Sequence, residues 1–319
     1  MNNVATPGAG SPKPGGEIVG GWLDLQEILR GLLYQGETAV SPLPRLKGIE
    51  QKSLALLQSD PDAGLFILFQ ALADVTLGYC ATHALLTAVV CHLTAEKLGL
   101  AETSTQLLFR AALTMNIGMA RAQDSLARQS SSLNEAQRKL IQDHPKMSLE
   151  ILQTLGVTDE DQLDIVRWHH DPEATAGKAG NLENRGILHM ADSFVAKMAP
   201  RKTRLAMSCL GAAKSIFLDA PADTARRGSA MAAAVGFYPP GTYVHLINGE
   251  NAVSVARGPR ANNPYVMSIV NAGGMPLSQY LYRDTSDPRF AIRAPINAEK
   301  IKVKVSLAKV LRARTERGV

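Results

Sequence analysis

Histidines and acids recur at wide spacing through the middle of the chain, in the residue types that bind divalent metal ions. Imidazole nitrogens and carboxylate oxygens suit zinc, manganese and iron, and such ions activate water for attack on phosphate esters. The candidate ligands are His83, His144, His169, His170 and Asp192. A single histidine is more often a structural core residue than a ligand, so the prediction depends on the whole set.

The order of these residues resembles the HD-GYP branch of the HD phosphohydrolases. The matching stretches are His83, Met115-Asn116-Ile117-Gly118-Met119, His144-Pro145, His169-His170-Asp171 and Ala191-Asp192. Active members carry an early His, then His-Asp-Ile-Gly-Lys, His-Pro, His-His-Glu with a Gly-Tyr-Pro loop, and Ala-Asp. Tyr238-Pro239-Pro240-Gly241-Thr242 is similar to the segment that often closes the domain, so the resemblance covers roughly residues 75–255.

The chain departs from this pattern at the centre of the motif. Met115, Asn116 and Met119 stand where the family has His, Asp and Lys. Asp171 replaces Glu, and the stretch from Pro172 onward is shorter than the family loop and holds no Tyr. The resemblance therefore implies a degenerate member.

Electrostatics explains why the loss at Asn116 matters. Two dications about 4 Å apart repel each other by roughly 16 kcal/mol at an effective dielectric of 20, so an anionic ligand must bridge them. Asn116 is neutral, and the thioether of Met115 is a poor ligand for a hard metal. We expect that the two-metal site does not assemble.

A site for one Fe, Mn or Zn ion stays open as an alternative. His144, His169, His170 and Asp192 form a plausible nitrogen and oxygen ligand set, to which His83 could add. If His169 and His170 lie on one helix, they point about 100° apart. One would then bind the metal and the other would support it.

The residues that would bind phosphate are also altered. Met119 removes the lysine that the resemblance places near substrate phosphate, whereas Arg201, Lys202 and Arg204 match a basic stretch of the family. These cations could hold an anion. Alternatively, they complement the dipole at the end of the preceding helix.

Composition excludes several other classes of protein. The chain has 319 residues, of which 45% are hydrophobic and only 5% aromatic, which argues against a nucleic-acid binder that stacks bases. No charge-free run of about 18 apolar residues and no signal-peptide pattern occurs, so we expect a cytoplasmic protein. The scattered Cys80, Cys91 and Cys209 indicate buried free thiols. The net charge of +5 comes entirely from residues 299–319.

The apolar pattern predicts a mainly α fold: an HD-type helical bundle with an N-terminal helical extension and a small β-rich C-terminal appendage. We expect a disordered leader over 1–20, helices over 21–74, the degenerate HD-GYP domain over 75–235 and a β-rich region with a basic tail over 236–319. The alternation of Lys and apolar residues over 300–305 predicts a strand.

More local signals set the expected element boundaries. An apolar run predicts one long helix from Gly64 to Leu98, closed by Gly99. Capping boxes are expected at Thr103–Gln106 and Ser132–Glu135. Pro145 is expected to end one helix and begin another. A last core helix is expected over 182–198, and hairpin strands are expected on either side of Asn248-Gly249.

By resemblance, the chain would be a regulatory or protein-interaction module in bacterial cyclic di-GMP signalling. Its partners would be signalling proteins such as diguanylate cyclases. Two alternatives remain: a metal-dependent phosphohydrolase with one ion, and a non-catalytic receptor for a cyclic dinucleotide.

Overall fold

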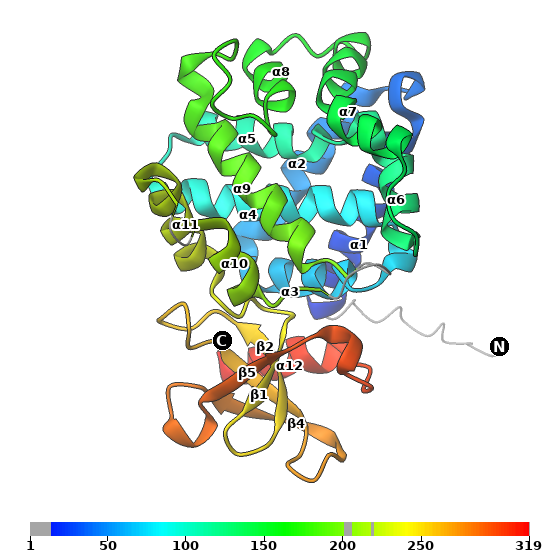
Figure 1. The fold of residues 1–319 in the computed structure, drawn as a ribbon. Coiled ribbons are helices and arrows are strands. Elements are labelled where there is room, and N and C mark those ends of the chain that lie inside the picture. The colour runs from blue at the N-terminus through cyan, green and yellow to red at the C-terminus, as the bar shows by residue number, and fades with distance from the viewer. Residues whose placement is uncertain (1–13, 201–205, 218–219, 319) are drawn as a thin grey trace, which may run out of the picture.

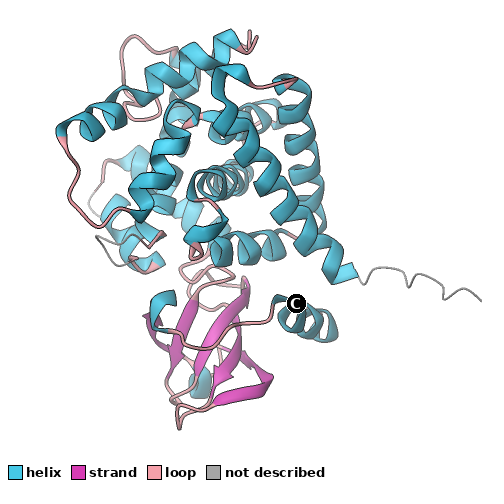
Figure 2. Cartoon of the chain, turned by 90° about the vertical axis from the view of Figure 1, so that its right-hand side faces the viewer, coloured by secondary structure: helices cyan, strands magenta, loops and turns pink. Residues whose placement is uncertain are grey.

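The computed structural model describes residues 14–200, 206–217 and 220–318. These residues form a helical part with a five-stranded antiparallel sheet at one end, as the two views in Figures 1 and 2 show. The predicted mainly α fold with a small β-rich C-terminal appendage is confirmed. Within the described residues, no helix is both long and apolar enough to span a lipid bilayer.

The helices from α1 to α11 precede the sheet in the chain, and α12 follows it. They are α1 (Pro14–Gln35), α2 (Pro42–Ser59), α3 (Pro61–Leu72), α4 (Tyr79–Leu98), α5 (Glu102–Thr114), α6 (Ala120–Arg128), α7 (Glu135–Thr154), α8 (Glu160–Arg167), α9 (Leu182–Met198), α10 (Cys209–Phe217), α11 (Ala222–Val235) and α12 (Leu307–Arg317). Two short 3-10 helices matter for the site: η3 (Ile117–Met119) and η4 (Ala179–Asn181).

Helix α4 runs through the centre of the helical part (Figure 1) and is buried along 16 of its 20 residues. Its sequence carries no Asp, Glu, Lys or Arg before Glu96, so nearly every face can be buried against a neighbouring helix. Gly99 ends it in the left-handed conformation, as predicted. Because α4 is central, His83 near its beginning lies in the core and needs hydrogen-bond partners there.

The beginning of α4 is held by a carboxylate from another helix. The side chain of Asp124 in α6 accepts a hydrogen bond from the Cys80 backbone N–H at 2.6 Å, and it also accepts one from the Tyr34 hydroxyl in α1. Burial and the neighbouring Asp124 raise the pKa of Tyr34 to about 12, so its hydroxyl remains a donor. This contact joins α1, α4 and α6 close to His83.

The sheet has the strand order β4-β3-β2-β1-β5. Its strands are β1 (Tyr243–Leu246), β2 (Asn251–Ala256), β3 (Tyr265–Val270), β4 (Pro276–Asp284) and β5 (Ile292–Ile296). The β1–β2 hairpin turns at Asn248-Gly249, as predicted, with Gly249 at a φ of 87°. One face of the sheet buries Phe66 from α3 together with residues of α12.

The first turn of α3 connects the helical part to the sheet. Asp60 caps α3 and also pairs with Arg314 of α12 at 3.1 Å, while Asp62 pairs with Arg257 beyond β2 at 2.5 Å. Gly241 packs directly on this helix, because a Cβ at that position would lie 2.7 Å from the Phe66 carbonyl oxygen. Two ion pairs and one close backbone contact therefore fix the sheet on α3.

Several predicted boundaries in the N-terminal half are wrong. Residues 14–20 belong to α1 rather than to a disordered leader, and residues 1–13 lie outside the described part. The expected helix over 64–98 is divided into α3 and α4, because Asp74 caps a short 3-10 turn and Gly78 takes a φ of 96°. The run of apolar residues concealed this break, since both helices are buried.

The two predicted capping boxes and the predicted helix end at Pro145 are also wrong. Helix α5 starts at Glu102, so Thr103 lies inside it and forms no capping box. The capping box of α7 uses Asn134 and Gln137 rather than Ser132 and Glu135. Pro145 lies inside α7 and does not end it.

The predicted strand over 300–305 is wrong, since these residues form no strand and lead into α12. The alternating apolar residues Ile301, Val303 and Val305 instead pack in an irregular segment against the core of the sheet. Alternation therefore indicated correctly which side chains are buried, although the backbone does not pair.

Glu250 provides a test of the sheet's electrostatics. Its carboxylate accepts hydrogen bonds from Arg283 at 2.8 and 2.9 Å and from Ser268, which joins the β1–β2 turn to β3 and β4. The hydrogen bonds from Arg283 outweigh partial burial and lower the pKa of Glu250 to about 2. A carboxyl whose pKa is lowered on folding contributes stability above its unfolded pKa, and loses it as pH falls through the folded value.

We expect Glu250→Gln to lower the free energy of unfolding at pH 7 by about 1–2 kcal/mol. The difference from the wild type should shrink as the pH falls from about 4.5 to about 2. Urea unfolding at a series of pH values measures this, with Glu150→Gln at an exposed helical pair as the control. A difference that stays constant across this pH range would contradict the assignment.

Candidate metal centre

The structure brings the five predicted ligands into two adjacent groups. His83 and Asp192 form a hydrogen-bonded pair, and His144, His169 and His170 form a cluster. A cavity of about 150 Å³ connects them, since its lining includes His83, His170 and Asp192.

The first group is a buried histidine–carboxylate pair between α4 and α9. The His83 Nε2 lies 2.7 Å from an oxygen of Asp192, and its Nδ1 lies 3.2 Å from the Tyr79 hydroxyl. Burial acts to raise the pKa of Asp192, but the hydrogen bond and charge of His83 outweigh it and hold this pKa below its ordinary range. Asp192 is therefore an ionised carboxylate, as a metal ligand must be.

In the second group, a proline sets the orientation of His144. Pro145 lies inside α7 and has no backbone N–H, so the carbonyl of Ile141 four residues earlier loses its helical partner. The His144 Nδ1 occupies that place at 2.6 Å from the Ile141 oxygen. A carbonyl oxygen can only accept, so Nδ1 carries the proton and a neutral His144 has a lone pair on Nε2.

His169 is held in the same way at a helix end. Helix α8 ends at Arg167, and its last carbonyls have no helical partner. One of them, on Val166, accepts a hydrogen bond from the His169 Nδ1 at 2.7 Å. Burial lowers the pKa of His144 to about 4, and burial also holds the pKa of His169 well below its ordinary value. Both rings are therefore neutral, with their lone pairs on Nε2.

The two lone pairs face each other. The Nε2 atoms of His144 and His169 are 3.2 Å apart, and in these tautomers neither has a proton to donate. His170 adds a third nitrogen, and the three ligating atoms lie within 4.8 Å of one another. His144 and His169 are buried and His170 is exposed, so the cluster opens to solvent on one side. A cation would stabilise the converging lone pairs, and three imidazoles are a common donor set for zinc. The residues present therefore fit a metal ion.

The placement of His169 and His170 differs from the prediction. They lie in a turn after α8 rather than on a helix, so they do not diverge by 100°. Their ring centroids are 4.2 Å apart, and both rings approach His144. His189 donates from Nδ1 to the His169 carbonyl at 2.9 Å and so supports this turn.

The segment from Met115 to Met119 lies beside these residues, although it contains no His, Asp or Glu. Met115 is fully buried in the apolar core. Asn116 lines the cavity with Met119, and the buried Asn116 amide oxygen has no hydrogen-bond partner within the described part of the chain. Asp192 is the single carboxylate among the described residues that line the cavity.

The backbone of this segment packs closely on α7. The Gly118 N–H donates to the Ser148 hydroxyl at 3.0 Å, and that hydroxyl donates to the Met115 carbonyl at 2.7 Å. A Cβ on Gly118 would lie 2.8 Å from the Ser148 nitrogen and 2.9 Å from the His144 carbonyl oxygen. Gly118 thus permits close approach to the helix that carries His144.

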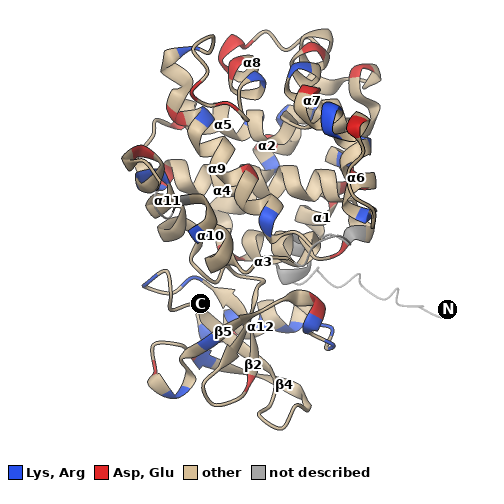
Figure 3. Ribbon diagram, in the orientation of Figure 1, with Lys and Arg blue, Asp and Glu red and all other residues tan. Residues whose placement is uncertain are grey.

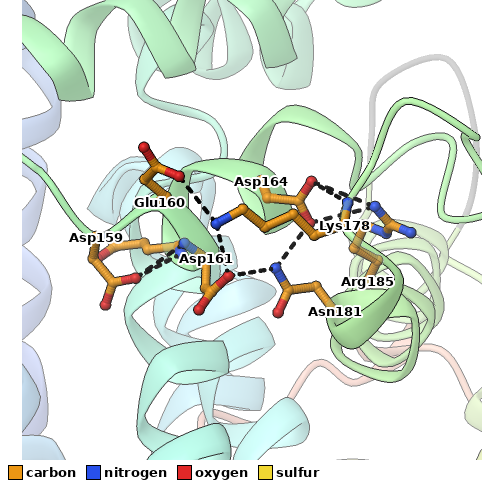
Figure 4. A network of polar contacts seen from close by, with 8 residues as sticks. Asp159, Glu160, Asp161, Asp164, Lys178, Asn181 and Arg185 are labelled. Atoms are coloured by element: carbon orange, nitrogen blue, oxygen red, sulfur yellow. Dashed lines mark hydrogen bonds and ion pairs between the residues drawn. The ribbon is translucent and has the colours of Figure 1, made fainter.

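A polar network holds the loop that follows His170. Figure 4 shows Asp164 of α8 between Arg185 of α9 and the side chain of Asn181. Arg185 reaches Asp164 at 3.3 Å with both side chains buried, and the Lys178 backbone N–H donates to Asp164 at 2.9 Å. Gly177 lies directly over the guanidinium, because a Cβ there would overlap it.

Sequence reasoning missed the residues that position the ligands. Ser148, Asp164 and Arg185 carry no motif and are polar residues whose role appears only in the packed structure. The effect of Pro145 could have been found, because a proline inside a helix always frees the carbonyl four residues earlier. The predicted phosphate-binding residues Arg201, Lys202 and Arg204 lie outside the described residues.

Comparison with known proteins assigns a domain type to the part of the chain that holds these residues. Residues 80–197 match the model of the HD domain. The chain carries an HD domain. A solved structure similar to it is Bd1817, an HDG"Y"P protein from Bdellovibrio bacteriovorus, with 15% sequence identity, a TM-score of 0.48, and coverage of 67% of this chain and 70% of that chain. No curated protein matches the sequence.

Two glycines, Gly118 in η3 and Gly48 in α2, test the packing. We expect Gly118→Ala to lower the free energy of unfolding by about 1–3 kcal/mol, because the methyl group must push η3 away from α7. Gly48→Ala in α2 is the matched control, since a Cβ there meets nothing within 4 Å, and it should be neutral or stabilising. Equal effects in denaturant unfolding would contradict the close contact.

Proposed function

We propose that this HD domain is a degenerate HD-GYP domain without two-metal phosphodiesterase activity. It serves as a regulatory or protein-interaction module in bacterial cyclic di-GMP signalling. The observation that carries the loss of activity is the cavity lining, in which Asn116 is neutral and Asp192 is the single carboxylate. The signalling role rests on the resemblance to the HD-GYP family.

The charge argument supports the loss of the two-metal centre. Two divalent ions bring four positive charges, and the imidazoles of His144 and His169 are neutral. One carboxylate leaves most of that charge uncompensated, at a repulsion of roughly 16 kcal/mol between the ions. Met119 also offers no cation to a substrate phosphate, so both the metal and the substrate lose their electrostatic partners.

The preserved packing supports a role that depends on shape. The contacts of Gly118 with Ser148 and the network around Asp164 join elements of the HD domain through protein groups alone. A domain that keeps its form can bind a partner after its chemistry has been lost.

The direct test is an assay with cyclic di-GMP. We expect that purified protein loaded with Mn²⁺ or Fe²⁺ leaves cyclic di-GMP intact, as followed by chromatography of the linear product. An active HD-GYP phosphodiesterase assayed in parallel is the positive control. Turnover that disappears in His169→Ala or Asp192→Ala would refute the proposal.

A second candidate is a phosphohydrolase with one metal ion, which acts on another phosphate ester or nucleotide. The specific observation that favours it is the convergence of the lone pairs of His144 and His169 beside His170. A bound metal would supply a Lewis acid and an activated water there. The chain's own contribution is to hold the imidazoles neutral and oriented through the Ile141 and Val166 carbonyls.

Metal binding separates the one-metal candidate from a site without metal. We expect the wild type to take up about one Zn²⁺ or Mn²⁺ per chain, and His144→Ala and His169→Ala to bind at least tenfold more weakly. His245→Ala in β1 is the control, because it removes an imidazole away from the cluster. Metal analysis after dialysis gives the stoichiometry, and protein without metal would exclude the candidate.

A further inference from the structure

A second cavity lies away from the HD domain, between strand β4 and helix α12. Its volume is about 300 Å³, and it is open to solvent along the edge of the sheet. Tyr280 and Tyr282 line it from β4, and Lys309, Arg312, Glu316 and Arg317 line it from α12. We call it the Tyr–Arg cleft.

Three of the seven cations in the basic C-terminal stretch, Lys309, Arg312 and Arg317, line this cleft. Residues 299–319 carry a net +5, which equals the formal charge of the chain, so the preceding residues sum to zero. Blue segments, which mark Lys and Arg, recur around α12 and the nearby strands in Figure 3. Glu316 is already paired with Arg312 at 2.9 Å. Within the described part of the chain, no acid pairs with Lys309 or Arg317.

The tyrosines add flat ring surfaces to these charges. Tyr280 and Tyr282 are two residues apart in β4 and therefore point to the same face of the sheet. The Lys309 ammonium lies 5.7 Å from the Tyr280 ring centroid, and the Arg317 guanidinium lies 5.7 Å from that of Tyr282. Both distances are near the outer limit of a cation–π contact, so these cations are weakly held by the rings.

The tyrosine rings themselves are firmly placed. Tyr282 stacks on Tyr265 of β3 with centroids 5.9 Å apart, and the Tyr280 hydroxyl accepts a hydrogen bond from the Ser306 N–H at 3.1 Å. Burial raises the pKa of Tyr282 to about 12, so its hydroxyl stays neutral near pH 7. The cleft thus joins fixed aromatic surfaces to two exposed cations, Lys309 and Arg317, which have no acidic partner among the described residues.

We propose that the Tyr–Arg cleft binds a nucleotide unit, with the base stacked on a tyrosine ring and the phosphate held by Arg317 and Lys309. Aromatic rings stack with any base, and arginine binds phosphate through two parallel hydrogen bonds. A volume near the lower end of ligand pockets suits a single nucleotide unit. That unit can come from a free nucleotide or from single-stranded RNA.

The aromatic residues are distributed unevenly along the chain, which changes the expectation drawn from composition. An aromatic content of 5% argued against stacking, but three of the seven tyrosines lie together next to the most basic helix. A percentage over the whole chain does not show such a local concentration. The inference is independent of any metal in the HD domain.

The test measures binding of a fluorescein-labelled ten-nucleotide uridine RNA to the full chain by fluorescence polarisation, with AMP and inorganic phosphate as competitors. We expect saturable binding that weakens about sevenfold between 50 and 200 mM salt, which corresponds to two phosphate contacts. Tyr282→Ala should weaken binding at least fivefold, whereas Tyr282→Phe keeps the ring and should bind like the wild type.

Variants of the basic residues test whether the cations of the cleft hold the phosphate. Arg317→Ala should weaken binding of RNA and AMP, and Lys139→Ala should not, since it removes an equally exposed cation from α7. Arg317 is exposed at the end of α12, so its replacement should leave the fold intact, which circular dichroism checks. If AMP alone saturates the cleft, the source is a free nucleotide; if only the RNA binds, the source is a strand.

Two results would overturn the proposal. One is equal binding by Tyr282→Ala and the wild type, which would leave only a diffuse attraction between α12 and a polyanion. The other is displacement of the RNA by inorganic phosphate as effectively as by AMP, because the base would then contribute nothing.

Discussion

The arrangement of the candidate metal centre depends on two backbone carbonyls that have lost their helical partners. Pro145 frees the carbonyl of Ile141, and the end of α8 leaves that of Val166 unpaired. Each carbonyl accepts a hydrogen bond from an Nδ1, so each imidazole must present a lone pair on Nε2. The backbone therefore determines the chemistry of two side chains, and burial then keeps both neutral.

The rest of the helical part keeps these carbonyls in place. Helix α7 is one continuous helix, so the freed carbonyl of Ile141 stays within hydrogen-bond distance of the His144 ring. The network from Asp164 to Arg185 holds the loop that follows His170 (Figure 4), and His189 holds the carbonyl of His169. Buried ion pairs of this kind contribute little net stability, but they restrict the number of conformations that a loop can adopt.

Much of the architecture was predictable, because hydrophobic periodicity indicates which face of a helix is buried and glycines mark turns and helix ends. Helix α9 over 182–198 and the hairpin at Asn248-Gly249 are examples. The division between α3 and α4 was missed because both sides of the break are equally apolar. The expected strand over 300–305 was wrong because burial alternates there without backbone pairing.

For the site, sequence order identified which histidines converge but not how they are held. His144 and His169 are held by carbonyls three residues earlier in the chain, whereas His83 is held by Asp192, which lies 109 residues away. No local pattern encodes such a pairing, since it arises when two helices pack.

The contact between η3 and α7 has a consequence for how this chain can change over evolutionary time. Ser148 recognises the N–H of Gly118 and the carbonyl of Met115, which are groups that almost every amino acid shares. The side chains at 115, 116 and 119 take no part in that recognition. A change of side chain at any of these three positions therefore leaves both hydrogen bonds available, so the residue types here can diverge without loss of this helix contact.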